Sequence, residues 1–247
     1  MFRIAMQAHR YLLVASVIGA LVACENRSRP KDTTANQGSG SALPTQPSPD
    51  PTPAADVAPP TAADLATYTK DLPGTGSKLM AKIETTMGTL TCELYGDKAP
   101  MTVANFVGLA TGKKPWMGTD GKVQRDKPFF DGITFHRVIP EFMIQGGDPT
   151  ASGRGGPGYA FDDEIWQGQH ILPGVLAMAN AGQQGGHGTN GSQFFVMEGE
   201  RPDLDSKHTV FGKCAELDVV KKITHVKTES DKPIEDIKIT KVTISKG

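Results

Sequence analysis

Hydrophobic and polar positions alternate in short runs from residue 78 to the C-terminus, which predicts a domain built mainly from β-strands. The runs 78–84 and 89–94 flank a TTMG turn and indicate a hairpin. The last run, 236–244, changes phase between Ile239 and Val242, which indicates a β-bulge. Short apolar runs bounded by Gly and Pro predict further strands at 133–139, 142–146, 175–178, 194–197 and 209–214.

Two segments instead have the helical period. Pro100 suits the first turn of a helix, Val103 and Phe106 follow at helical spacing, and Gly112 ends it. Residues 217–225 suit a second, shorter helix. Many short strands with two separate helices favour a closed barrel, because closure removes exposed strand edges. Composition alone does not separate a barrel from a sandwich.

The N-terminus predicts export. Residues 1–23 read as a signal peptide, with Arg3 and Arg10 before an apolar stretch that is too short to span a bilayer. Small residues immediately before Cys24 resemble a bacterial lipobox, in which this Cys is lipidated; the alternative is an ordinary signal with a chance Cys. We expect a lipid-anchored protein of the bacterial cell envelope, periplasm-facing or surface-exposed. Glu25, in place of Asp, slightly favours the outer membrane.

A linker is predicted to follow, so that residues 24–76 comprise the lipidated Cys24 and a disordered Pro/Thr/Ala-rich tether. Nine of the 18 prolines lie between Pro30 and Pro73, and such composition buries too little apolar area to offset ordering. A helical turn or two is expected within 62–70. Residues 77–247 are long enough for one globular domain.

Charge, cysteine and histidine content limit which partners and sites the sequence allows. Without residues 1–23 the chain has 24 basic against 27 acidic residues, which argues against a nucleic-acid partner. Cys92 and Cys214 could pair outside the cytoplasm or remain buried thiols, and we favour two unpaired thiols. The histidines lack metal-ligand spacing, so no metal and no cofactor are predicted. A monomer is the default expectation.

The densest candidate chemistry lies in residues 135–148, which read FHRVIPEFMIQGGD. Arg137, Met143 and Gln145 share one strand parity and can face the same way, while a bend after Pro140 could bring Phe142 round to join them. The result would be an apolar floor with two hydrogen-bonding groups above it. Because the run contains no nucleophile, it suits binding and twisting rather than bond breaking.

These residues resemble cyclophilins, the family of peptidyl-prolyl cis–trans isomerases. Besides 135–148, the resemblance rests on FDDE at 161–164, LAMANA at 176–181, TNGSQFF at 189–195 and KHTVFG at 207–212, in the family's order and spacing. It implies an eight-stranded antiparallel β-barrel capped by two α-helices. It also implies catalysis of X–Pro bond rotation in proline-containing polypeptides, here exported ones.

The resemblance also implies site residues. Arg137 would be the catalytic donor to the twisted amide, with Gln193 helping to position it or the peptide. The proline pocket would comprise Phe142, Met143, Phe195, Leu204 and His208. The substrate backbone would be bound by Gln145, Ala179, Asn180, Ala181 and Gln193. His136 is expected to be peripheral, and the acids at 162–164 to be structural.

One departure concerns Asp203, which stands where many cyclophilins have a Trp that helps to hold cyclosporin, so we expect weak drug binding. The loops 113–127 and 183–188 are enlarged. The alternative to an isomerase is a non-catalytic proline-peptide-binding or chaperone module tethered to the envelope.

Overall fold

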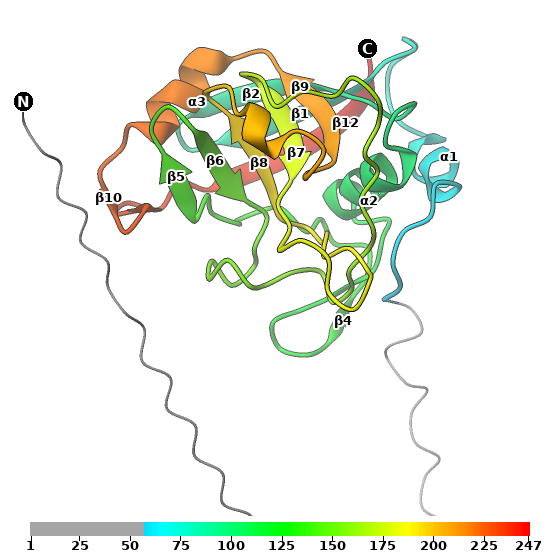
Figure 1. The fold of residues 1–247 in the computed structure, drawn as a ribbon. Helices are drawn as coiled ribbons and strands as arrows, with labels where there is room; N and C mark the ends of the chain where they lie inside the picture. The colour runs from blue at the N-terminus through cyan, green and yellow to red at the C-terminus, as the bar shows by residue number, and fades with distance from the viewer. Residues whose placement is uncertain (1–56) are drawn as a thin grey trace, which may run out of the picture. The chain divides into compact units, whose positions relative to one another are not determined.

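The computed structural model describes residues 57–247; the predicted signal, Cys24 and most of the predicted linker lie outside the described residues. Its centre is a strongly curled antiparallel sheet of eight strands (Figure 1). The strand order is β12 (Ile239–Lys246), β1 (Leu79–Thr85), β2 (Gly88–Leu94), β9 (Val210–Cys214), β7 (Val175–Met178), β8 (Phe194–Met197), β6 (Met143–Gly146) and β5 (Arg137–Ile139).

The two edges of this sheet meet only at a seam. Thr134, just before β5, forms an isolated bridge with Lys238, just before β12, and the Phe135 N–H donates to the Ile237 carbonyl over 2.9 Å. The predicted strand at 133–139 is therefore regular only over β5. The mainly β, eight-stranded antiparallel architecture is confirmed, but a fully closed barrel overstates this half-barrel with a narrow seam.

Two main helices cover the sheet, as predicted. Helix α2 (Pro100–Thr111) ends at Gly112, whose φ of 74° is a conformation that glycine adopts without steric cost. Its Phe106 ring packs 5.0 Å from Phe130 and 5.4 Å from Phe211 in the main core. Helix α3 (Leu217–Thr224) lies near β5 and β6 (Figure 1).

Smaller elements complete the domain: the 3-10 turn η2 (Pro202–Leu204) and the hairpins β3 (Trp116–Met117) with β4 (Val123–Gln124) and β10 (Thr228–Glu229) with β11 (Lys232–Pro233). Within residues 57–247 no helix is long and apolar enough to cross a bilayer.

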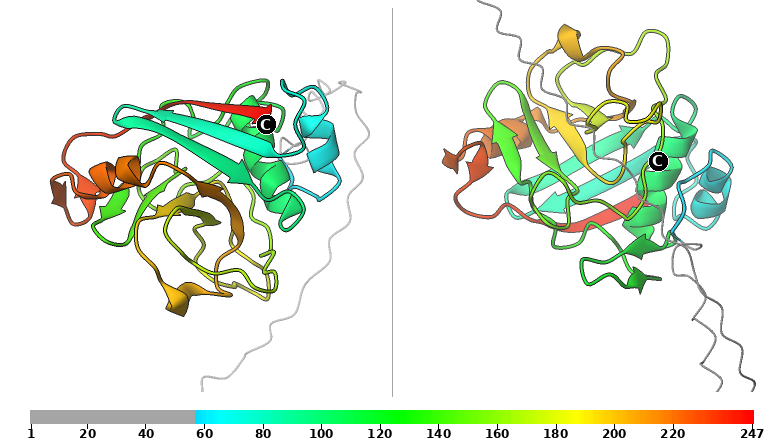
Figure 2. Two further views of the ribbon diagram at one scale, coloured as in Figure 1. Left: turned by 90° about the horizontal axis from the view of Figure 1, so that it is seen from above. Right: turned by 60° about the horizontal axis from the view of Figure 1, so that its bottom comes forward.

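The end of the predicted linker packs on the domain, which differs from the expectation of a tether reaching residue 76. We call residues 57–72 the N-terminal strap. It contains helix α1 (Asp64–Thr69), which lies beside α2 (Figure 2), and its Leu65 and Tyr68 pack against the main core. Lys114 is 5% exposed as a residue, and its ammonium donates to the Ala58 carbonyl over 2.8 Å. The short helix expected within 62–70 is confirmed.

Strand pairing decides two further predictions. The bulge is confirmed, because Glu84 pairs with Lys241 while Thr85 pairs with Ile239, leaving one extra residue in β12. The expectation of unpaired thiols is wrong: Cys92 of β2 lies directly opposite Cys214 of β9, and the two form a disulfide. Register between strands 122 residues apart brings them together, which sequence spacing does not reveal.

Apolar side chains form two separate clusters. The main core fills the space between the sheet and α2 and includes Cys92, Cys214 and most phenylalanines. The second cluster contains Met143, Ile171, Val175, Ala177, Phe195, Met197 and Val210, with Phe142 and Leu204 among the side chains packed at its margin. Four residues predicted for the proline pocket therefore belong to this second cluster.

Candidate active site

The Arg137 side chain lies above the margin of the second cluster. Arg137 of β5 pairs in register with Gln145 of β6, and its Nη1 donates to the Gln145 Oε1 over 3.4 Å. The Arg137 Cζ lies 5.9 Å from the centre of the Phe142 ring, within the range of a cation–π contact. The side chain is 43% exposed, so its remaining N–H groups can reach a ligand.

A chain of amides continues from this arginine. Gln145 Nε2 donates to Gln193 Oε1 over 3.0 Å, and Gln193 Nε2 donates to the Gly155 carbonyl over 2.9 Å. Gln145 is also directly opposite Phe195 of β8 in the sheet. Because adjacent strands fix these residues in register, the guanidinium and the apolar floor have a defined relation to each other.

The floor is formed by Met143 and Phe195, which are 2% and 5% exposed. Phe142 and Leu204 flank them. The His208 ring meets the Phe195 ring edge to face with centroids 5.3 Å apart, and its Nδ1 lies 3.0 Å from the Met178 carbonyl. Burial lowers the pKa of His208 below its ordinary value, which favours the neutral ring.

Beside this floor lies a recess of about 530 Å³. Its lining includes all five residues predicted to bind the substrate backbone, together with the loop 153–160. The Ala179 N–H donates to the Gln193 carbonyl and the Ala181 N–H to Thr189 Oγ1. Since successive peptide groups of an extended chain point to opposite sides, the main chain of Asn180 faces away from these partners.

The Asn180 side-chain amide is engaged within the protein. Its Nδ2 donates to Asp163 Oδ1 over 3.0 Å and approaches the Lys207 carbonyl at 3.3 Å. Both contacts hold the chain around the recess. The structure thus leaves the backbone of Asn180, rather than its amide, suited to contact a peptide.

The acidic run at 162–164 makes structural contacts, as predicted. Glu164 accepts the N–H groups of Met101 and Thr102 at the start of α2, over 3.0 and 2.7 Å. Asp163 accepts from Asn190 over 2.8 Å, and Asp162 accepts the Gly188 N–H. His136 is buried, and neither ring nitrogen has a hydrogen-bond partner within residues 57–247.

Two charged neighbours of the site were not anticipated. Arg201 also lies over the Phe142 ring, with its Cζ 4.6 Å from the ring centre. It pairs with Asp203 through two hydrogen bonds of 2.7 Å. Asp231, at the tip of the β10–β11 hairpin, lies 3.6 Å from Arg137 Nε. Both residues are far along the chain from 135–148, and no sequence pattern linked either of them to that segment.

Comparison with known proteins decides the family. Residues 80–244 match the family model described as cyclophilin type peptidyl-prolyl cis-trans isomerase/CLD. The chain belongs to the cyclophilin family. It is 47% identical over 170 residues to a probable peptidyl-prolyl cis-trans isomerase A of Mycobacterium leprae, a match that covers 67% of this chain and 91% of that protein.

Other cyclophilins are similar over the same part of the chain. The peptidyl-prolyl cis-trans isomerase A of Mycobacterium tuberculosis is 47% identical, with 67% and 91% of the two chains covered. A crystal structure of a Cryptosporidium parvum cyclophilin type isomerase matches with a TM-score of 0.59 and 30% identity, covering 69% of this chain and 99% of that one. The same Cryptosporidium protein, crystallised in the presence of the dipeptide Ala-Pro, matches with a TM-score of 0.58.

This cyclophilin is therefore a peptidyl-prolyl cis–trans isomerase, and the predicted activity is confirmed by family and relatives. Cyclophilins bind proline-containing peptides. The geometry is compatible with that activity, because donors and an apolar floor lie side by side and the task requires no bond to be broken.

Proposed function

We propose that Arg137 catalyses the rotation by stabilising the twisted X–Pro amide. Resonance gives the amide a rotation barrier of about 18–20 kcal/mol. Halfway through the rotation the conjugation is lost, and the proline nitrogen becomes pyramidal with a lone pair that accepts a hydrogen bond. A guanidinium presents a planar fork of N–H donors, so its bond to that nitrogen forms only in the transition state and lowers the barrier selectively.

In this proposal the proline ring occupies the apolar floor. Met143 and Phe195 contact the ring from below, Phe142 and Leu204 flank it, and His208 borders it. The observation that supports this arrangement is the 5.9 Å separation between the Arg137 guanidinium and the Phe142 ring at the margin of the second cluster. Holding the ring still while the preceding carbonyl turns is what catalysis of this rotation requires.

The rest of the peptide lies along the recess. The backbone of Asn180, between Ala179 and Ala181, pairs with the substrate as an added strand, which provides affinity without dependence on side chains. Gln145 and Gln193 contribute side-chain hydrogen bonds, and their bond to each other over 3.0 Å fixes both amides. Gln145 also orients Arg137, since it accepts from the guanidinium.

The test is to measure cis–trans exchange of an Ala-Pro or Leu-Pro peptide catalysed by the wild-type protein and by Arg137→Ala. We expect kcat/KM to fall ten- to a thousandfold, which corresponds to roughly 1.4–4 kcal/mol of barrier. Lys241→Ala, which removes an exposed cation from β12, serves as the control and should leave kcat/KM unchanged. Equal rates for wild type and Arg137→Ala would refute the assignment, whereas unchanged peptide binding with lost exchange would support it.

We further propose that the enzyme is a lipoprotein of the bacterial envelope that acts as a monomer on exported polypeptides. Support comes from the basic start of the chain, the short apolar stretch 11–23 and the small residues before Cys24. Several acyl chains on one cysteine give stable anchoring. Because the strap packs on the domain, residues 57–72 are not part of the proposed tether.

Mass spectrometry of the mature protein tests the anchor. The proposal expects an N-terminal Cys24 carrying acyl chains, and Cys24→Ala should move the protein from the membrane fraction to the soluble fraction. Cleavage at another position, or a Cys24→Ala variant that stays in the membrane fraction, would refute lipid anchoring without affecting the isomerase assignment.

A further inference from the structure

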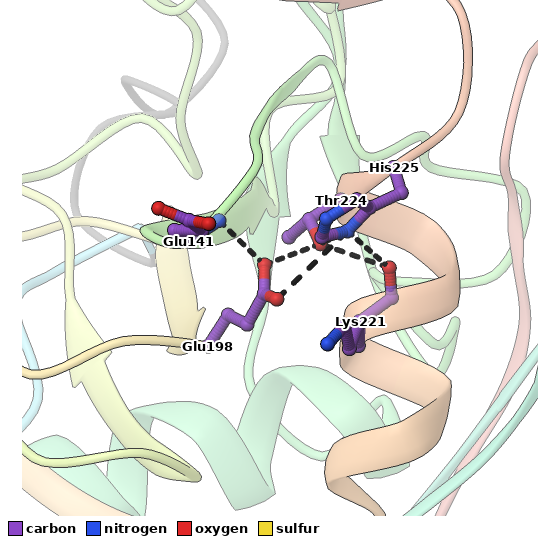
Figure 3. Close-up of polar contacts among 5 residues, drawn as sticks. All are labelled: Glu141, Glu198, Lys221, Thr224 and His225. Carbon is purple, nitrogen blue, oxygen red and sulfur yellow. Dashed lines mark hydrogen bonds and ion pairs between the residues drawn. The ribbon is translucent and has the colours of Figure 1, made fainter.

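A carboxylate outside the proposed site connects its aromatic margin to a helix. Glu198 follows β8, and its side chain is only 12% exposed. Figure 3 shows it pointing between the turn at Glu141 and the C-terminal end of α3. Its Oε2 accepts the Glu141 N–H over 2.7 Å and the Thr224 hydroxyl over 2.6 Å, while Oε1 lies 3.8 Å from His225 Nδ1.

The turn held by this carboxylate has an unusual sequence. The Phe142 N–H donates to the Ile139 carbonyl over 3.1 Å, closing a β-turn with Pro140 and Glu141 at its centre. Glu141 has a φ of 59°, a left-handed conformation that glycine adopts without cost and other residues adopt reluctantly. This conformation costs an L-residue roughly 1–2 kcal/mol, which a hydrogen bond to its N–H helps to offset.

Phe142 is the next residue after this strained position. Its carbonyl accepts the N–H groups of Glu198 and Gly199 over 2.8 and 3.2 Å, and a Cβ on Gly199 would collide with the Glu141 carbonyl. The segment after β8 therefore packs closely against the turn. Any change in the conformation of Glu141 would redirect the Phe142 ring, and with it the margin against which Arg137 and Arg201 lie.

We propose that Glu198 is a positioning residue for the isomerase: its carboxylate holds Glu141 in the left-handed conformation and so keeps Phe142 beside Arg137. The inference rests on the proposed role of Phe142 in the proline pocket. Glu198 acts through the turn and touches neither the substrate nor the guanidinium. Thr224, which is fully buried, anchors the carboxylate from α3.

Single variants give the first test, with kcat and KM measured on a Leu-Pro peptide. We expect Glu198→Ala to lower kcat/KM about five- to fiftyfold, since small misplacements in a site are costly. Glu198→Gln keeps one oxygen that can accept both bonds and should retain at least about half of the activity. Glu200→Ala removes an exposed carboxylate from the same loop and should behave like wild type.

A double variant separates positioning from general stability. Glycine adopts a positive φ without the help of a carboxylate, so Glu141→Gly should make Glu198 dispensable for the turn. Glu198→Ala combined with Glu141→Gly should therefore come within about threefold of Glu141→Gly alone in kcat/KM. A role confined to stability would lower the melting temperature of both Glu198→Ala proteins and leave the loss of activity in place.

The outcomes are decisive. Full activity of Glu198→Ala, or a loss that Glu141→Gly does not restore, would overturn the proposal. Phe142→Ala distinguishes this failure from that of the underlying assignment: if Phe142→Ala is as active as wild type, the proposed pocket is wrong. If Phe142→Ala is impaired and Glu198→Ala is not, only the positioning role fails.

Discussion

The disulfide between Cys92 and Cys214 provides the sharpest prediction of stability. It closes a loop of 122 residues, and restricting the unfolded chain by a loop of that length is worth at most about 5 kcal/mol at 25 °C in the chain-entropy treatment. Both cysteines are buried in the main core, 0% and 2% exposed. We expect Cys92→Ala combined with Cys214→Ala to lower the free energy of unfolding by about 2–5 kcal/mol.

The assay is denaturant unfolding followed by circular dichroism, with and without reductant, after incubation long enough for buried thiols to equilibrate. Wild type should lose stability in reductant, and the double variant should be insensitive to it, which makes the variant its own control. In a domain of this size the melting temperature should fall by roughly 4–20 °C, at about 2–4 °C for each kcal/mol. Identical midpoints for oxidised and reduced wild type would refute the argument.

Activity at low temperature should survive the same change. The disulfide belongs to the main core, whereas the residues proposed to bind the proline ring belong to the second cluster. A reduced enzyme that remains folded should therefore keep its kcat/KM. Loss of activity without loss of structure would show that the two clusters are not independent.

Three further predictions concern pH, the strap and the loop after β8. Burial lowers the pKa of His136 and His208, so the unfolded chain takes up protons below about pH 6.5 that the folded protein does not. Stability should then fall as the pH falls, by up to about 1.4 kcal/mol per pH unit for each histidine, and His136→Gln should flatten this slope in acid denaturation. A chain that begins at residue 77 loses the packing of Leu65 and Tyr68 and exposes Lys114. Its free energy of unfolding should therefore be about 2–4 kcal/mol lower than that of a chain that begins at residue 57. Cyclosporin should bind weakly, and Asp203→Trp, which replaces the partner of Arg201 by an aromatic ring, should tighten binding in calorimetry; a nanomolar dissociation constant for wild type would contradict this expectation.

The sequence pattern predicted those elements that are determined by neighbouring residues in the chain. The bulge in β12 was visible because the apolar phase changes within four residues, and α2 was visible because Pro100 and Gly112 mark its ends. The helix in the strap was expected as well. Its packing on α2 was not, because the proline-rich composition around it predicts a tether and only a few apolar side chains, such as Leu65 and Tyr68, oppose that trend.

Long-range register explains what was missed. Nothing near Cys92 or Cys214 indicates that the two strands pair, so the choice between thiols and a disulfide could not be made from spacing. Likewise, the stacking of Arg201 on Phe142 depends on the loop after β8 returning to the β5–β6 turn. Family motifs gave the residues of the proposed site but not the charged groups Arg201 and Asp231 beside them.

The proposed site combines residues on paired strands with residues on loops. Arg137, Gln145 and Phe195 stand opposite one another on neighbouring strands, where register fixes their relation and leaves little freedom to move. The recess that would hold the flanking residues of the peptide is bounded instead by the loop 153–160 and by the chain near Asn180. Loops tolerate substitution better than paired strands. Variation in this family should therefore change which peptides bind well while leaving the mechanism of rotation in place, because preference and catalysis depend on different elements.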